Sequence, residues 1–208
     1  MTRVHASKKA LAGVAAAVML GAMAFGSAPA FADDPVSGPT DVPVNVTVAA
    51  TGALTMTVDN SPVTLTENGS DASNRKFTGT LGTVTVTDTR SDVPAGVGWA
   101  VVGESSDFTD GSKTIPAKYL GWAPALVNEP AGNDVVAAGS DVDSQAVDSS
   151  SPGLTTGVDI LAFTIDSQQA KVESGEWKAN ANLALVAPAD EVSSGTYSST
   201  LTLSLFEY

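Results

Sequence analysis

The sequence of 208 residues contains no cysteine and a single histidine, His5. The lack of cysteine excludes a disulfide framework, a lipid-anchoring cysteine and thiol catalysis. With one imidazole near the start of the chain, Ser/His and Cys/His nucleophiles and histidine-rich metal sites are not expected either. Carboxylate pairs and Ser/Lys dyads remain, but no local motif marks them. The sequence therefore predicts a protein that is not an enzyme.

Basic residues are also scarce, with 10 Lys and Arg against 23 Asp and Glu and a formal net charge of −13. Affinity for nucleic acid comes largely from Lys and Arg that release counterions from phosphates, so nucleic acid is not an expected partner. The same acidity disfavours binding to anionic membranes and adsorption of the protein onto a negatively charged wall polymer by bulk electrostatics. Any binding to the wall would have to use short-range contacts or bridging cations, within a Debye length of about 8 Å.

Residues 1–32 have the three parts of a secretory signal peptide. Basic residues precede an apolar run from Ala10 to Phe25, and Ala30-Phe31-Ala32 offers a small-x-small cleavage site. An uncleaved anchor helix is the alternative, but it needs about 20 strongly apolar residues, whereas this run is rich in Ala and Gly. We therefore predict a secreted, extracellular protein with no stable membrane span after cleavage.

From Val42 onward, apolar and polar residues alternate with the period of two that half-buried strands show. Val42–Val48, Val84–Arg90 and Tyr197–Leu205 are the clearest examples. We expect roughly nine or ten short strands and almost no helix beyond the signal peptide. The predicted fold class is all-β, an antiparallel β-sandwich of one domain over residues 42–208, preceded by a flexible tether at residues 33–41.

Residues 129–157 interrupt this pattern because Gly, Ser, Asp and Ala dominate them. A loop this long is usually functional or disordered, and its composition favours a disordered or exposed insertion. Asp141 and Asp143 within it resemble an oxygen-rich calcium loop, but the central Gly and terminal Glu of an EF-hand are missing. A solvated acidic loop is therefore favoured and no cofactor is expected, with calcium as the open alternative.

Flat aromatic side chains can serve as platforms that stack on sugars. Trp99 shares an apolar row with Val97 and Val101, which favours a place in the core. Trp122 lies with Tyr119 in a short segment without clear alternation, which makes it the better candidate for exposure. Tyr119 and Trp122 are therefore the predicted ligand-binding residues.

Two segments carry a resemblance to a known family. Val84–Arg90 followed by Gly98–Val101, together with the closing Gly195–Leu205, resembles the two hallmark segments of WxL-domain surface proteins of Gram-positive bacteria. The sequence departs from that pattern in two places. The first tryptophan is followed by Ala-Val rather than x-Leu, and Leu203 stands where the second tryptophan belongs. The resemblance is thus to a divergent form, of the type expected in an actinobacterium.

The resemblance implies a surface protein held non-covalently at the cell wall through peptidoglycan or another wall polymer. The sequence shows no Leu-Pro sorting signal and no hydrophobic tail, so covalent anchoring is not expected. The alternative function is a structural or adhesive subunit of a surface complex. In that case an exposed edge strand would pair with another surface protein.

The residues themselves indicate a structural role for the paired motifs. Asp88 and Arg90 lie on the same face of a predicted strand, which favours an ion pair between them. Leu203 and Leu205 share a face with Tyr197, which fits core packing rather than contact with a glycan. We therefore expect these residues, with Trp99, to hold two core strands together.

Overall fold

The computed structural model describes residues 46–59, 62–127 and 135–208, and it confirms an antiparallel all-β fold. Twelve strands are formed by these residues, a few more than expected. They are β1 (Leu54–Val58), β2 (Thr66–Glu67), β3 (Asn74–Thr80), β4 (Val84–Asp88), β5 (Trp99–Ser105), β6 (Phe108–Asp110), β7 (Lys113–Ile115), β8 (Leu120–Val127), β9 (Val136–Ala138), β10 (Asp159–Thr164), β11 (Glu176–Pro188) and β12 (Leu201–Glu207).

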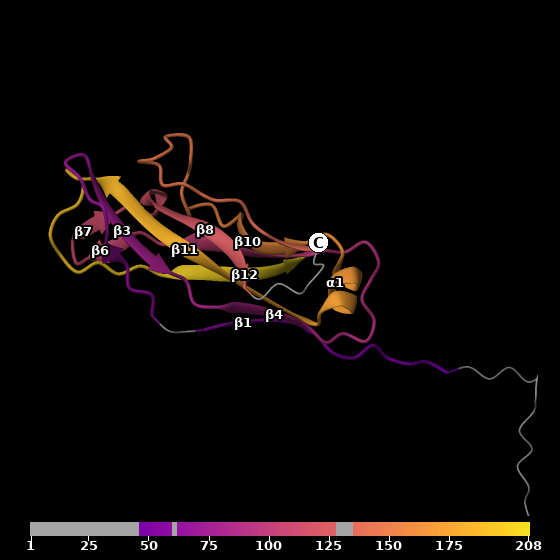
Figure 1. Ribbon diagram of the computed structural model, residues 1–208. Helices are drawn as coiled ribbons and strands as arrows, with labels where there is room; N and C mark the ends of the chain where they lie inside the picture. The colour runs from indigo at the N-terminus through magenta and orange to yellow at the C-terminus, as the bar shows by residue number, and fades with distance from the viewer. Residues whose placement is uncertain (1–45, 60–61, 128–134) are drawn as a thin grey trace, which may run out of the picture. The chain divides into compact units, whose positions relative to one another are not determined.

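One sheet is built around β11, a strand of 13 residues (Figure 1). One side of β11 pairs first with β4 and then with β3, while its other side pairs with β8. β1 continues the sheet beyond β4, and β2 continues it beyond β3. All of these pairs are antiparallel, so neighbouring side chains on one face come from alternate residues of every strand.

The second sheet has the order β12-β5-β10-β9, and β6 and β7 form a separate hairpin. β12 therefore lies at one edge of its sheet, paired on one side only with β5. A register shift between Ile160 and Ala162 marks an irregularity in β10. This shift turns Phe163 to the outer face beside Ala100, although the alternation of the sequence predicts a row of Leu161, Phe163 and Ile165.

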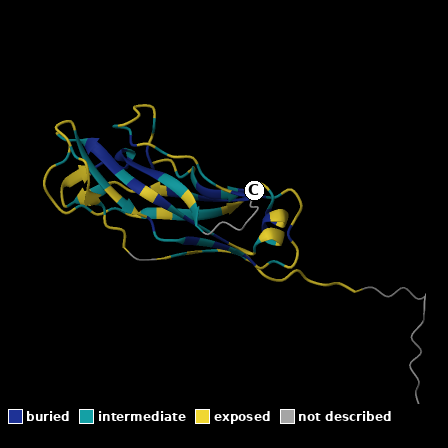
Figure 2. Cartoon of the chain, viewed as in Figure 1, coloured by how far each residue is buried: buried dark blue, intermediate teal, exposed yellow. Residues whose placement is uncertain are grey.

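The core lies between the inward faces of the two sheets, where Figure 2 shows buried residues gathered along the strands. Every second residue of β11 from Trp177 to Leu185 is buried, as are Val84 and Val86 of β4. Burial of such a Val or Leu side chain contributes about 1.5 to 3 kcal/mol. The period of two in the sequence thus reports correctly which faces are buried.

A short helix, α1 (Ser167–Glu173), was not expected from the sequence. Asp166 caps it by accepting a hydrogen bond from the N–H of Gln169 at 2.9 Å, and Ala170 anchors it by burial. Seven residues are too few for a helical period to stand out from the surrounding alternation. No helix in the described part of the chain is long and apolar enough to cross a membrane.

The strand predicted over Val42–Val48 is not found where it can be tested. Residues 42–45 lie outside the described residues, and residues 46–50 belong to no strand. Val46 and Val48 are each 85% exposed. The sequence pattern is that of a strand, but within this chain the described part of the segment has no sheet to join.

The prediction of a disordered or exposed insertion at residues 129–157 is wrong as to disorder in the described part, residues 135–157, although many of these residues are exposed. Leu154 is fully buried, and its N–H donates to the carbonyl of Leu120 in β8 at 2.9 Å. Trp122 and Val142 exchange two backbone hydrogen bonds of 2.9 Å. This segment thus lies along the side of β8 that does not pair with β11. Its residues can be small and acidic, because backbone hydrogen bonds hold them there without apolar side chains.

Candidate functional site

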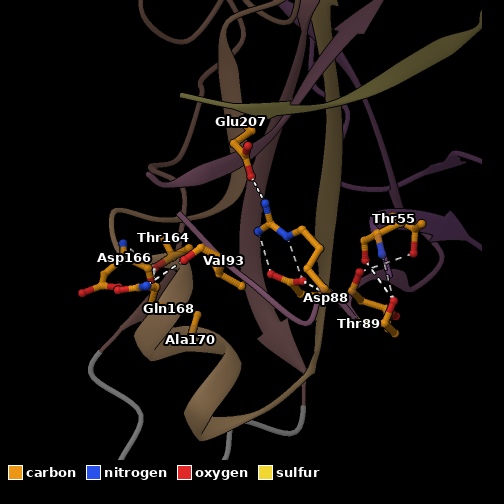
Figure 3. Close-up of polar contacts among 12 residues, drawn as sticks. Thr55, Asp88, Thr89, Val93, Thr164, Asp166, Gln168, Ala170 and Glu207 are labelled. Atoms are coloured by element: carbon orange, nitrogen blue, oxygen red, sulfur yellow. Dashed lines mark hydrogen bonds and ion pairs between the residues drawn. The ribbon is translucent and has the colours of Figure 1, made fainter. Parts of the chain in front are cut away.

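Asp88 and Arg90 form a buried ion pair at the end of β4. The guanidinium donates from Nε to Oδ1 of Asp88 at 2.9 Å and from its second terminal nitrogen to Oδ2 at 2.7 Å. The side chains are only 7% exposed for Asp88 and 14% for Arg90. The other terminal nitrogen contacts Glu207 of β12, so the two carboxylates approach the guanidinium separately (Figure 3). Arg90 therefore links the two sheets.

Asp88 and Arg90 each shift the pKa of the other. Burial alone would raise the pKa of the Asp88 carboxyl, but the hydrogen bonds and charge of Arg90 outweigh burial and hold this pKa below its ordinary value. The hydrogen bond to Asp88 raises the pKa of Arg90 further, against the effect of burial. Both groups are therefore charged at neutral pH, and neither is suited to proton transfer.

Trp99 and the closing segment Gly195–Leu205 also lie in or against the core. Trp99 lies in the core at the start of β5. Leu203 and Leu205 of β12 are half-buried against the core, as is Tyr197, whose hydroxyl donates to the carbonyl of Ser193 at 3.0 Å. The segments Gly98–Val101 and Gly195–Leu205 thus meet where β12 pairs with β5, beside the contact of Glu207 with Arg90.

The predicted ligand-binding residues are buried, so the expected exposure of Trp122 is wrong. Trp122 is 2% exposed and Tyr119 is 5% exposed. The indole of Trp122 reaches across to the second sheet, where it packs against Gly103 of β5. The hydroxyl of Tyr119 donates to both carboxylate oxygens of Glu191, at 2.9 and 3.0 Å. Neither ring offers a free face for a sugar.

A polar groove of about 470 Å³ lies on the outer face of the first sheet. Its floor comes from alternate residues of β3, β11 and β8, which include Thr78, Thr80 and Asn182. The segment after β9 forms one wall with Asp141 and Asp143. This wall is fixed to β8 by the paired backbone bonds between Trp122 and Val142.

The groove carries hydrogen-bonding groups over a floor of small residues. Thr80 donates to the amide oxygen of Asn182 at 3.3 Å, and Asn68 donates to the hydroxyl of Thr78 at 3.4 Å. None of the lining residues is basic. Its volume falls in the range of small-molecule sites, about 300 to 1,000 Å³. The groove can therefore present donors and acceptors to a polar, uncharged or cationic ligand.

The sequence does not reveal this groove, because an outward-facing polar residue on a strand has the same alternation whether it faces open solvent or a groove. Thr78, Thr80 and Asn182 occupy outward positions, as the alternation predicts. The missing step was the wall, because no local pattern shows that residues 139–154 fold back along β8. Across the described residues, no group of three or more Asp, Glu, His or Cys side chains is arranged to hold a metal ion.

No family model matches the sequence, and a search of curated proteins finds no relative. The class that the structure defines is therefore that of an antiparallel β-sandwich with a walled polar groove on one outer face. The resemblance to WxL domains remains a prediction from the sequence motifs.

Proposed function

We propose that this protein is a secreted, non-enzymatic module that binds the Gram-positive cell wall non-covalently, with peptidoglycan as the ligand. The observation that carries the proposal is the groove on the outer face of the first sheet. The resemblance to WxL domains and the predicted signal peptide support the location. The proposal places the contact in the groove rather than at Tyr119 and Trp122, because both rings are buried.

The chemistry of the groove suits saccharide hydroxyl and acetamido groups. Asn, Thr and Asp side chains supply both donors and acceptors, and Thr78, Thr80 and Asn182 are exposed to receive a ligand. Asp141 and Asp143 with no basic neighbour in the lining oppose a phosphate-rich polymer. A neutral glycan pays no such electrostatic penalty, and each hydrogen bond to it adds about 0.5 to 1.5 kcal/mol.

The proposal is tested by sedimentation with purified peptidoglycan sacculi, with and without calcium. We expect the wild-type protein to sediment with the sacculi. Thr80→Ala combined with Asn182→Ala should weaken binding several-fold, because both side chains are exposed in the groove. Thr202→Ala, on an exposed strand position outside the groove, is the matched control. Failure of the wild type to sediment, or equal losses in both variants, contradicts the proposal.

A second candidate is a structural subunit that assembles with other surface proteins by strand pairing. The observation that favours it is the position of β12 at the edge of its sheet. The two candidates separate in one comparison. A wall-binding module sediments with sacculi from which all protein has been stripped, whereas a protein-binding subunit sediments only when the surface proteins are left in place.

A further inference from the structure

The outer edge of β12 carries unpaired backbone groups at alternate residues. Gly98 and Tyr208 exchange both of their backbone hydrogen bonds, and Ser106 donates to the carbonyl of Thr200. In an antiparallel ladder the direction of these groups alternates. The even-numbered residues of β12 therefore face β5, and the odd-numbered residues, Leu201 to Glu207, direct N–H and C=O away from it. β12 pairs with no other described strand.

The side chains of the same odd-numbered residues are incompletely covered. Leu201, Leu203 and Leu205 point toward the core, yet each is only half-buried. Between Leu201 and Leu205 this edge carries no charged residue, proline or bulge, the features that usually protect an edge strand from pairing. One more strand on this side would satisfy the backbone groups and cover the leucines.

A segment of matching length and pattern precedes β1 in the sequence. Residues 42–48 read Val-Pro-Val-Asn-Val-Thr-Val, seven residues with a valine at every second position, and β12 also has seven residues. In the described part of this segment, Val46 and Val48 are each 85% exposed. Exposed valines in alternation are the expected state of a strand that lacks a partner.

We propose that residues 42–48 of one copy add as an antiparallel strand to the outer edge of β12 in a second copy. In this arrangement the valines lie opposite the half-buried leucines, and each valine directs its N–H and C=O toward β12. Pro43 is then turned outward, where its missing N–H costs no ladder bond. In a parallel arrangement Pro43 and its alternate neighbours would have to bond with β12 instead.

The same geometry favours pairing between copies over pairing within one chain. The N–H of Ser91 donates to the carbonyl of Thr51 at 2.7 Å, and the adjacent Arg90 contacts Glu207. Thr51 is thus fixed close to the C-terminal end of β12. A strand leading into Thr51 along its own β12 would run parallel to it, the direction that Pro43 disfavours. Residues 42–48 can therefore pair in the antiparallel direction only with β12 of another molecule.

This contact joins residues 42–48 of one copy to the edge of β12 of another. In a pair of copies, one molecule still has a free segment 42–48 and the other still has a free β12 edge. Repetition gives either a closed ring or an open chain of subunits, depending on the rotation between neighbours. The proposal does not rest on wall binding, since the groove lies on the other sheet.

The first test is the association state of the exported protein by sedimentation velocity at rising concentration. We expect the wild type to form dimers and higher species. Val46→Lys and Val48→Lys should each weaken association about tenfold, which corresponds to about 1.4 kcal/mol. Thr47→Lys adds the same charge on the opposite face of the segment and is the control, expected to associate as the wild type does. The exposure of all three positions protects the fold from these changes.

The second test uses the absence of cysteine from the chain. A Val46→Cys protein is mixed with a Leu203→Cys protein in the presence of a short thiol cross-linker. We expect a cross-linked pair, and much less of it from Thr47→Cys mixed with Leu203→Cys, because a shift of one residue turns the thiol to the other face. A wild type that stays monomeric overturns the proposal. So does association that both lysine variants at Val46 and Val48 retain, because the valines would then not be at the contact.

Discussion

Arg90 holds Asp88 through two nearly equal contacts, of 2.9 and 2.7 Å, although the residues are only two positions apart. The backbone N–H of Arg90 also donates to Oδ1 of Asp88, at 3.0 Å. These bonds fix the chain as it leaves β4. They also aim the remaining terminal nitrogen at Glu207, so a local turn determines a contact between two sheets.

We predict that Arg90→Ala strongly destabilises the protein. It would leave the carboxylate of Asp88 buried without its partner, and breaking a buried pair in this way costs about 3 to 5 kcal/mol. A loss of about 3 kcal/mol lowers the melting temperature by about 6 to 12 °C in a domain of this size. The measurement is thermal unfolding followed by circular dichroism, and a decrease below about 2 °C would contradict the buried pair.

Glu207→Gln is the comparison for this experiment. Glu207 is more exposed than Asp88, and exposed ion pairs contribute only about 0.2 to 1 kcal/mol. We therefore expect a small decrease in melting temperature from Glu207→Gln. A similar decrease in both variants would mean that Asp88 gains no special stability from its burial.

The pair also predicts a dependence of stability on pH. The pKa of Asp88 is lower in the folded protein than its ordinary value of about 3.9 in an unfolded chain. The stabilisation is therefore fully present above about pH 4 and is lost as the pH falls through the lowered pKa. Thermal unfolding at falling pH should show the wild type and Asp88→Asn converging in stability.

Asp71 must be considered in the same titration. A hydrogen bond from Lys76, together with backbone N–H donors, lowers the pKa of Asp71 to about 2. The wild type therefore loses stability in acid for two reasons. Because Asp71 is present in both proteins, the difference between wild type and Asp88→Asn isolates Asp88. A difference that stays constant down to about pH 2 would contradict the assignment.

The alternation of the sequence predicts the sheet faces well but not the contacts between distant segments. Asp88 and Arg90 are recognisable because they are close in the chain. Glu207 is not, because its contact with Arg90 depends on how the two sheets pack. The wall of the groove is not predictable from the sequence for a related reason. Val142 is held by backbone hydrogen bonds to Trp122, and such bonds leave no pattern in the side chains. Trp122 lies in a segment without clear alternation, yet it is buried. Its burial depends on Gly103 in the opposite sheet, which no local pattern indicates.

Helix α1 provides a prediction about a feature that the alternation concealed. Asp166 accepts a hydrogen bond from the N–H of Gln169, so Asp166→Ala should destabilise the protein by about 1 kcal/mol. Asp166→Asn keeps an acceptor at this position and should lose little. Chemical unfolding at neutral pH measures both variants. Equal losses would show that the cap contributes through charge rather than through its hydrogen bond.

Gly103 leaves room for Trp122, and the last prediction concerns this contact between the sheets. A Cβ atom at Gly103 would lie 2.5 Å from Cη2 of Trp122, and overpacking of a core costs about 1 to 3 kcal/mol. We expect Gly103→Ala to destabilise the protein by that amount. Gly175→Ala is the matched control, because its new Cβ would meet only one carbonyl oxygen, at an ordinary 3.5 Å. In a double-mutant cycle, Gly103→Ala should cost less when Trp122 is replaced by Leu, since the smaller side chain relieves the clash. Additive losses in the two variants would show that the indole does not pack on Gly103.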